Sequence, residues 1–222
     1  MFQDRREAGR ILGEVVAQLP DIADGLVLGL VRGGVPVAFE VAKACGLPLD
    51  ILVVRKLGLP WQEELAMGAI ASGGAIVLNE DVLRSNRISA ARLEAVIERE
   101  KLELTRRETL YRQGQPAAPI DGRAVVLVDD GLATGASMRA AIRAVTGRAG
   151  RVIVAVPVGA RTTCEELCSM VDELVCALIP EPLDAVSLFY REFQATSDEE
   201  VRELLRRGAQ GATPTRTSPS VS

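Results

Sequence analysis

The amino-acid sequence predicts an α/β fold with an open parallel β-sheet flanked by helices. Two observations lead to this fold class: short apolar runs typical of buried strands recur along the chain, and helical patterns separate most of them. The predicted strands cover residues 26–31, 49–54, 75–78, 124–128, 151–158 and 173–179. With 222 residues, of which 48% are hydrophobic, the chain is long enough to bury a core without disulfide or metal support.

In the first half of the chain, proline and glycine mark where helices end. Apolar residues recur at helical spacing over residues 4–19, and Pro20 ends the pattern. A second helix is predicted over residues 35–45, with Gly46 as its C-cap. Residues 57–74 then interrupt the alternation of strands and helices. We expect a long irregular segment there, of the kind that often forms a mobile lid.

The second half of the chain carries clear helix-start signals. Ser89 is the predicted N-cap of a long, highly charged helix that reaches about Arg112, and another helix is predicted over residues 135–148. Predicted capping boxes open two further helices: Thr162 with Glu165, and Ser197 with Glu200. The last helix is expected to end near Arg207. Residues 208–222 are rich in Gly, Thr, Pro and Ser, so we expect a disordered tail.

Composition excludes several classes of function. The chain contains no histidine, which excludes histidine general bases and histidine metal sites. A net charge of −4 and an aromatic content of 3% disfavour a nucleic-acid binder. The charged start of the chain predicts no secretory leader, and no apolar run is long enough to span a bilayer. We therefore expect a cytoplasmic protein with no membrane contact.

The segment 125–137, VVLVDDGLATGAS, carries the clearest chemistry. An apolar strand ends in two carboxylates, Asp129 and Asp130, and a turn of small residues leads into a helix. Backbone N–H groups at such a helix N-terminus bind phosphate. Two acids beside a phosphate would repel it unless they bind hydroxyl groups or a hard cation. The residues therefore predict a phosphorylated sugar, with Mg²⁺, as the ligand.

This segment resembles the 5-phosphoribosyl 1-pyrophosphate (PRPP) binding motif of the type I phosphoribosyltransferases. The family pattern is an apolar strand, two acids, a short variable stretch, Thr-Gly, a small residue, and Ser or Thr. The resemblance implies the Rossmann-like fold of that family with a small hood. It also implies PRPP contacts at the following positions: Arg32, Gly33, Gly34, Arg55, Lys56, Asp129, Asp130, Ala133, Thr134, Gly135, Ala136 and Ser137.

Two upstream segments support the resemblance. Arg32-Gly33-Gly34 follows a predicted strand and looks like the pyrophosphate loop of the family, where backbone amides and an arginine hold the leaving group. The run 53–56 is typical of a strand that ends in two cations, Arg55 and Lys56. Adjacent strand residues point to opposite faces, so one of the two is expected to contact pyrophosphate. We favour Lys56.

The expected irregular segment 57–74 stands where the family has its mobile catalytic loop. Closure of such a loop would exclude water from the reacting sugar. Glu63 and Glu64 are the acid–base candidates on it, with Glu64 as the predicted catalytic residue. The alternative is that both are solvated surface residues. Trp61 either seals the closed loop or packs against the core.

The resemblance also predicts the domain organisation. It places one domain over residues 1–207, with the core at about 26–179 and an acceptor-selecting hood made by residues 1–25 and 180–207. Aromatic residues of the hood either stack on a base or form its core: Phe189, Tyr190 and Phe193.

One position departs from part of the family. Ala133 stands where members that act on 6-oxopurines carry an acid–base Asp, which disfavours guanine and hypoxanthine as acceptors. The whole-chain pattern is similar to a bacterial group of phosphoribosyltransferases whose acceptor is unassigned.

The resemblance implies a Mg²⁺-dependent enzyme that moves the phosphoribosyl group from PRPP to a nitrogen acceptor and releases pyrophosphate. Asp129 and Asp130 are its expected catalytic residues, and they would hold the metal indirectly, through ribose hydroxyls or water. The expected partners are PRPP and a small-molecule acceptor, and a homodimer is also considered because family members commonly form one. The alternatives are a PRPP- or nucleotide-sensing regulator of the same fold, and a PRPP hydrolase or silent binder.

Overall fold

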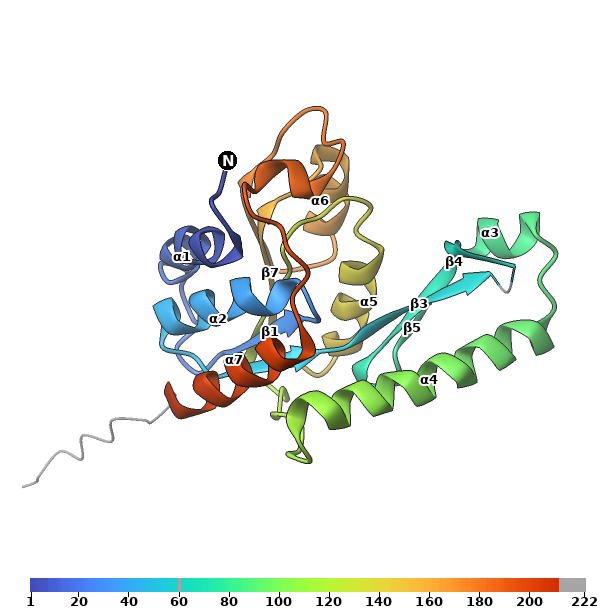
Figure 1. Cartoon of the computed structure of the whole chain (residues 1–222), viewed down its shortest axis with the longest axis horizontal. Coiled ribbons are helices and arrows are strands. Elements are labelled where there is room, and N and C mark those ends of the chain that lie inside the picture. Colours follow the sequence, from blue (N-terminus) through green and yellow to red (C-terminus); the bar gives the residue numbers. More distant parts are fainter. Residues whose placement is uncertain (60, 212–222) are drawn as a thin grey trace, which may run out of the picture.

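Five parallel strands form the main sheet of the protein, in the order β2-β1-β6-β7-β8 (Figure 1). Their bounds are β1 (Leu26–Leu30), β2 (Leu49–Leu52), β6 (Ala124–Val128), β7 (Arg151–Val158) and β8 (Glu173–Leu178). The computed structural model describes residues 1–59 and 61–211, and the side chains of these residues apart from 62–64 and 209–211. The predicted parallel sheet is therefore confirmed.

Helices cover both faces of this sheet. One face packs against α1 (Arg5–Val16), α2 (Gly34–Cys45) and α7 (Asp198–Gly211), and the other packs against α5 (Ala136–Val145) and α6 (Arg161–Cys168). Strand residues alternate between the two cores, as the pleat requires: Val126 and Val128 face the first, and Val125 and Leu127 face the second. This alternation explains why the strands are apolar throughout rather than amphipathic.

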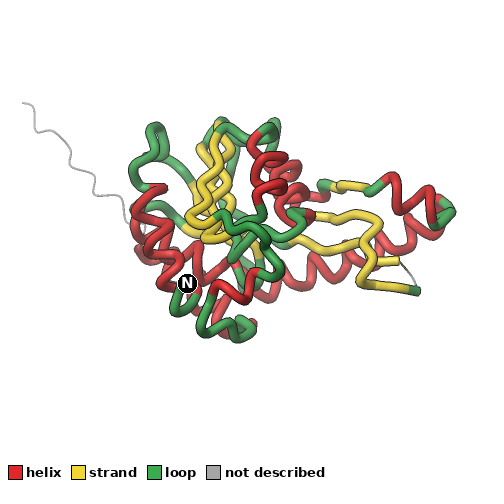
Figure 2. Tube along the Cα trace, turned by 90° about the horizontal axis from the view of Figure 1, so that it is seen from above, coloured by secondary structure: helices red, strands yellow, loops and turns green. Residues whose placement is uncertain are grey.

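A second, antiparallel sheet projects from the main sheet (Figure 2). It consists of β3 (Val54–Leu59), β4 (Gln62–Ala71) and β5 (Ile76–Leu78). A 3-10 turn, η1 (Ser72–Gly74), connects β4 to β5, and α3 (Glu80–Ser85) and α4 (Ala90–Arg112) follow. The long helix α4 runs back along the hairpin toward the main sheet (Figure 1). We call β3, β4, β5, α3 and α4 together the arm.

The prediction that residues 57–74 form a long irregular segment is wrong. Most of this segment is the β3–β4 hairpin, with irregular register between Leu57 and Leu59. Leu57, Leu59 and Met67 are fully buried in the core that also includes Val96 of α4. Glycines and a proline in the segment suggested a loop, whereas pairing between two strands and burial against α4 decide its structure.

Helix boundaries agree with the predictions in part. Ser89 caps α4 as expected, and Ser197 accepts a hydrogen bond from the Glu200 amide at the start of α7. The capping box predicted at Thr162 is wrong, because α6 begins at Arg161 with Ala160 at the cap position.

Two predicted helix ends also move. Helix α5 ends at Val145 instead of residue 148, because Thr146 adopts extended backbone angles. Helix α7 continues to Gly211, four residues beyond the predicted end. The rest of the predicted tail, residues 212–222, lies outside the described residues.

The N-terminus pairs with a segment that follows the main sheet. The Phe2 amide donates to the Phe189 carbonyl at 2.8 Å, and the Arg191 amide donates to the Phe2 carbonyl at 2.9 Å. The rings of Tyr190 and Phe193 lie 4.9 Å apart and pack in one cluster with Phe2. A 3-10 turn, η2 (Val186–Phe189), precedes this contact. These aromatic residues therefore form a small core between Phe2 and the segment 189–193.

No helix within residues 1–59 and 61–211 combines the length and apolar character needed to cross a membrane.

Candidate active site

The predicted ligand-binding loops meet at one end of the main sheet. Strands β1 and β6 are parallel neighbours, and the strand order reverses between them, since β2 lies on the far side of β1 and β7 on the far side of β6. The loop after β1 contains Arg32 and Gly33 and leads into Gly34, the first residue of α2, and the loop after β6 contains Asp129 and Asp130. In open α/β sheets, ligands bind beyond the carboxyl ends of the strands at such a reversal.

The glycine loop packs directly on the acidic pair. A Cβ atom built on Gly33 would lie 2.1 Å from Asp130 Oδ2, and one built on Gly34 would lie 2.6 Å from the Val128 carbonyl oxygen. Both positions therefore exclude side chains. The peptide bond between Val31 and Arg32 is cis. The structure thus brings together two of the predicted segments that lie about a hundred residues apart in the sequence.

The two carboxylates share a partly buried environment. The Asp130 amide donates to Asp129 Oδ1 at 2.9 Å. Burial raises the pKa of Asp129 well above its ordinary value, and the neighbouring charge of Asp130 raises it further. Burial also raises the pKa of Asp130, while Arg5 acts in the opposite direction. Ionised carboxylates at this position are thus costly without a cation or hydroxyl donors.

Arg5 supplies that cation, and the sequence analysis did not identify it. Its Nε and Nη2 atoms each lie 2.8 Å from Asp130 Oδ2, and the two side chains are only 11% and 17% exposed. The Tyr190 hydroxyl donates to the Asp130 carbonyl at 2.6 Å. Arg5 belongs to the N-terminal helix, 125 residues from its partner. No local pattern could have revealed this contact.

The predicted phosphate turn lies at the N-terminus of α5. Gly135 has a φ of 69°, and a Cβ there would lie 2.6 Å from Thr163 Cγ2. Within the described part of the chain, no side chain caps this helix, so its first N–H groups are available to an anion. Two carbonyl groups of the turn accept hydrogen bonds from neighbouring side chains. The Ala133 carbonyl accepts from the Thr163 hydroxyl at 2.6 Å, and the Thr134 carbonyl accepts from Arg139 Nη2 at 2.6 Å.

Arg55 and Lys56 both line a cleft of about 600 Å³, together with Ser137 of the phosphate turn. They lie near the start of β3, so the prediction that they end a strand is wrong. Arg55 donates to Glu100 Oε2 at 2.9 and 2.7 Å, so its charge is paired with α4. Lys56 is exposed. This pairing of Arg55 favours Lys56 as the cation available to a ligand.

Arg32 extends from the glycine loop toward α7. Its Nη1 atom lies 3.5 Å from Asp198 Oδ1, and both side chains are largely exposed. The Tyr111 hydroxyl donates to the same oxygen at 2.8 Å. This donor, and then Arg32, hold the pKa of Asp198 below its ordinary value. An exposed ion pair of this length is weak, so Arg32 is free to turn toward an anion.

The acid–base candidates Glu63 and Glu64 lie at the start of β4, and their side chains lie outside the described residues. Trp61, at the hairpin tip, is 56% exposed. The alternative that it packs against the core is therefore wrong for this structure.

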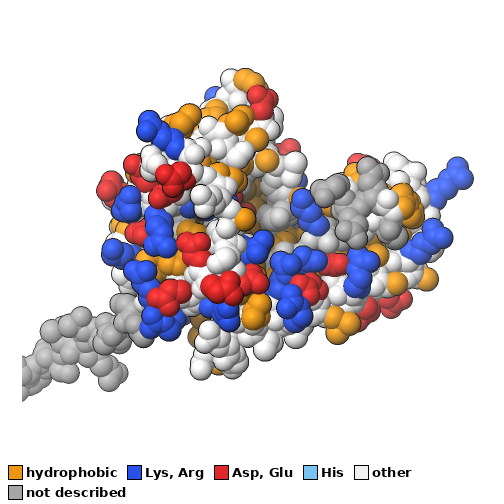
Figure 3. All heavy atoms as spheres, viewed as in Figure 1, with side chains coloured by type: hydrophobic (Ala, Val, Ile, Leu, Met, Phe, Trp, Pro, Cys, Tyr) orange, Lys and Arg blue, Asp and Glu red, His pale blue; other side chains and the backbone are white. Residues whose placement is uncertain are grey.

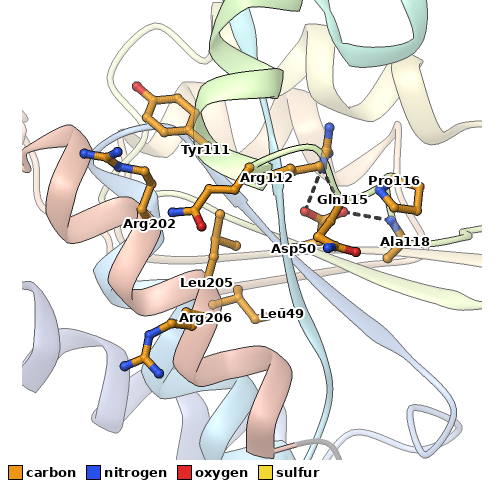
Figure 4. Close-up of a pocket in the computed structure, with 11 residues that line it drawn as sticks. Leu49, Asp50, Tyr111, Arg112, Gln115, Pro116, Ala118, Arg202, Leu205 and Arg206 are labelled. Atoms are coloured by element: carbon orange, nitrogen blue, oxygen red, sulfur yellow. Dashed lines mark hydrogen bonds and ion pairs between the residues drawn. The ribbon is translucent and has the colours of Figure 1, made fainter.

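Figure 4 shows a cavity of about 490 Å³ at a different place in the fold. It lies beside the first residues of β2, among α4, α7 and residues 113–118. Its buried acid, Asp50, accepts from Arg112 Nε at 3.0 Å and from the Ala118 amide at 2.9 Å. Because Asp50 has these partners, we interpret it as a structural residue that fixes the loop after α4.

The charged face of the arm carries both signs (Figure 3). Along α4, Lys101 pairs with Glu98, and both Arg106 and Arg107 pair with Glu103. Arg99 and Arg112 also have acidic partners. This pairing fits a solvated face better than a surface for nucleic acid, which would present unpaired cations.

Comparison with known proteins supports the resemblance. Residues 5–179 match the family model described as "Phosphoribosyl transferase domain". A Mycobacterium tuberculosis protein named "Putative phosphoribosyl transferase Rv0571c" is 48% identical over 208 residues, which cover 93% of this chain and 47% of that protein. The chain thus spans about half the length of that curated relative.

Two further relatives are informative. TT1426 from Thermus thermophilus, whose crystal structure is known, is 42% identical to this chain, and the two structures have a TM-score of 0.80. The match covers 94% of this chain and 99% of that chain. A protein of Chloroflexus aurantiacus named "Bifunctional protein PyrR" is 33% identical over 138 residues, which cover 60% of this chain and 68% of that protein. The similarity therefore extends across the sheet, the candidate site and the arm.

Proposed function

Because the chain belongs to the phosphoribosyl transferase domain family, we propose that it transfers the 5-phosphoribosyl group from PRPP to a nitrogen atom of a small-molecule acceptor and releases pyrophosphate. The observation that carries this proposal is the contact between the glycine loop and the acidic pair. Gly33 approaches Asp130 so closely that no side chain fits between them. A pyrophosphate on the loop would thus lie next to a ribose on the carboxylates.

In this proposal, different residues of the chain bind the 5-phosphate, the ribose and the pyrophosphate of PRPP. The 5-phosphate accepts from the backbone N–H groups of residues 134–137, at the N-terminus of α5. The ribose hydroxyls donate to Asp129 and Asp130. The departing pyrophosphate accepts from Arg32, from the amides of Gly33 and Gly34, and from Lys56.

The reaction itself is a substitution at the anomeric carbon. The acceptor nitrogen forms the new bond to that carbon, and the bond to pyrophosphate breaks with its electrons leaving on oxygen. Positive charge that develops on the sugar is stabilised by the two carboxylates. Positioning and electrostatics supply most of the catalysis, which suits a protein without histidine. We propose Glu64 as the group that takes the proton from the acceptor.

The acidic pair also fits a magnesium ion that is shared with the substrate. The described residues include no group of three or more acidic, cysteine or histidine side chains that could cage a metal by themselves. Mg²⁺ in proteins is often bound by one or two carboxylates, waters and substrate phosphates. Asp129 and Asp130 would hold it through water or ribose hydroxyls, and the ion would neutralise the pyrophosphate oxygens.

The hood is proposed to select the acceptor. We assign it to residues 1–25 and 180–207, which meet through Phe2 and the 189–193 segment. Ala133 lacks the acid–base group of the 6-oxopurine members, so an acceptor other than guanine or hypoxanthine is favoured. A nucleobase or small amine remains the acceptor class proposed.

The experiment is pyrophosphate release from PRPP and Mg²⁺ with purine, pyrimidine, pyridine and small-amine acceptors, each against a control without acceptor. Release that requires one acceptor would support the transferase and identify its substrate. Release without any acceptor would favour a hydrolase. PRPP binding without release would favour a sensor, and absence of PRPP binding would refute the proposal. Arg6→Met, which breaks an ion pair of α1 with Glu200 away from Asp130, provides a control variant.

A further inference from the structure

Arg5 is held in one orientation by its contacts with three residues. Its Nε atom donates to Asp130 Oδ2 at 2.8 Å, and its Nη2 atom lies 2.8 Å from the same oxygen as an ion pair. Its Nη1 atom donates to the Gln194 carbonyl at 2.7 Å. The carbon at the centre of its guanidinium lies 3.8 Å from the centroid of the Phe193 ring, which is a favourable distance for a cation–π contact. Arg5 therefore connects the cluster of Phe2, Tyr190 and Phe193 with the acidic pair.

Asp130 is also confined by Gly33 and Tyr190. Gly33 lies against Asp130 Oδ2, and the same hypothetical Cβ on Gly33 would lie 3.5 Å from Arg5 Nε. The Tyr190 hydroxyl holds the Asp130 main chain through its carbonyl oxygen. Among the hydrogen bonds of the described residues, none engages Asp130 Oδ1. One carboxylate oxygen is thus fixed by Arg5, and the other remains able to accept from a ligand.

We propose that Arg5 is a positioning residue for PRPP: it keeps Asp130 in the orientation that accepts a hydrogen bond from the ribose. This inference rests on the proposed function. It gives α1 a role in PRPP binding, although α1 contributes no residue to the predicted PRPP contacts. It also means that the segment carrying Phe193 and Gln194 influences PRPP binding through Arg5.

The opposite role makes the opposite prediction. If Arg5 blocked the site by occupying Asp130, the ribose would have to displace it, and removal of Arg5 would tighten PRPP binding. The positioning role predicts weaker binding instead.

The test is calorimetric PRPP binding with Mg²⁺ at pH 7, for wild type, Arg5→Met, Arg5→Lys and the control Arg6→Met. We expect Arg5→Met to weaken binding by at least about tenfold. Arg5→Lys restores the charge without the planar guanidinium, so it should recover part of the affinity. Arg6→Met should stay within about twofold of wild type, because an exposed ion pair contributes little.

Unchanged or tighter PRPP binding by folded Arg5→Met would overturn the proposal while leaving the proposed function intact. Wild type that binds no PRPP would overturn the proposed function and this inference together. If Arg5→Met does not fold, as judged by circular dichroism, Arg5→Lys decides the matter. Its binding should then be weaker than that of wild type, and wild-type affinity would refute the need for the guanidinium.

Discussion

Replacement of Gly33 by alanine tests the close contact on which the proposed site depends. The new Cβ would lie 2.1 Å from Asp130 Oδ2 and 2.9 Å from Asp130 Cγ. Contacts shorter than about 3.0 Å do not persist, so either the glycine loop or the aspartate must move. The aspartate cannot move freely, because Arg5 holds the same oxygen at 2.8 Å. The substitution therefore separates the loop from the acidic pair or separates Asp130 from Arg5.

The magnitude follows from these two consequences. An overpacked position costs about 1–3 kcal/mol, and here about 2 kcal/mol of the free energy of unfolding is expected. For a chain of this size, that loss lowers Tm by about 4–8 °C. PRPP binding should weaken by at least about tenfold, since one misplaced contact of about 1.4 kcal/mol already has that effect.

The assay combines thermal unfolding with calorimetric PRPP binding, and the chain offers a matched control. Gly33 and Gly46 lie at the two ends of α2. Gly46 has a φ of 65° and open space around it, so Gly46→Ala should cost about 1 kcal/mol of stability through its backbone alone. It should leave PRPP affinity unchanged. If Gly33→Ala equals wild type in both stability and affinity, the described contact does not exist and the site must be reassigned.

Three further predictions concern acidic residues. Asp130→Asn should lower the rate of pyrophosphate release by at least about tenfold, measured under saturating PRPP and acceptor; wild-type turnover would refute its catalytic role. Asp129→Asn should stabilise the fold at pH 7. Because the pKa of Asp129 is raised in the folded protein, its ionisation lowers the free energy of unfolding, and this cost decreases as the pH falls through the raised pKa. Urea unfolding at pH 7 and pH 5 should show the gain shrinking at the lower pH, and an equal gain at both would contradict it. Asp50→Ala should lower the free energy of unfolding by about 3 kcal/mol, because it leaves the nearly buried Arg112 without its main partner. Urea unfolding measures this as well, and a loss below about 1 kcal/mol would show that Glu108 and the Ile51 carbonyl suffice for Arg112.

Sequence patterns located the parts of the fold whose signals are local. The strand, the acidic pair and the small-residue turn of 125–137 are consecutive, so their arrangement at the start of α5 could be inferred directly. The same holds for the loop after β1. In each case, strand, turn and helix N-terminus form one short unit whose geometry depends little on the rest of the chain.

Features that depend on distant pairing were not predicted. The β3–β4 hairpin contains Gly58 in a strand, which is unfavourable by propensity, and it is stabilised by burial of Leu57 and Leu59 against α4. Arg5 resembles any other arginine of an amphipathic helix until α1 is placed beside the acidic pair. Likewise, the Thr163 hydroxyl donates to the Ala133 carbonyl, 30 residues away in the sequence, and no local pattern indicates this contact.

The contacts of Arg5 also set the order in which the site becomes complete during synthesis. Arg5 precedes the strands of the main sheet in the chain, whereas Phe193 and Gln194 lie beyond residue 179, where the family match ends. The five strands of the main sheet are all available before that point. A ribosome-bound chain therefore contains both anion-binding loops before it contains Phe193 and Gln194, which hold Arg5 against Asp130. A fragment cut at residue 179 would be expected to form the sheet yet present an acidic pair whose arginine is unsupported.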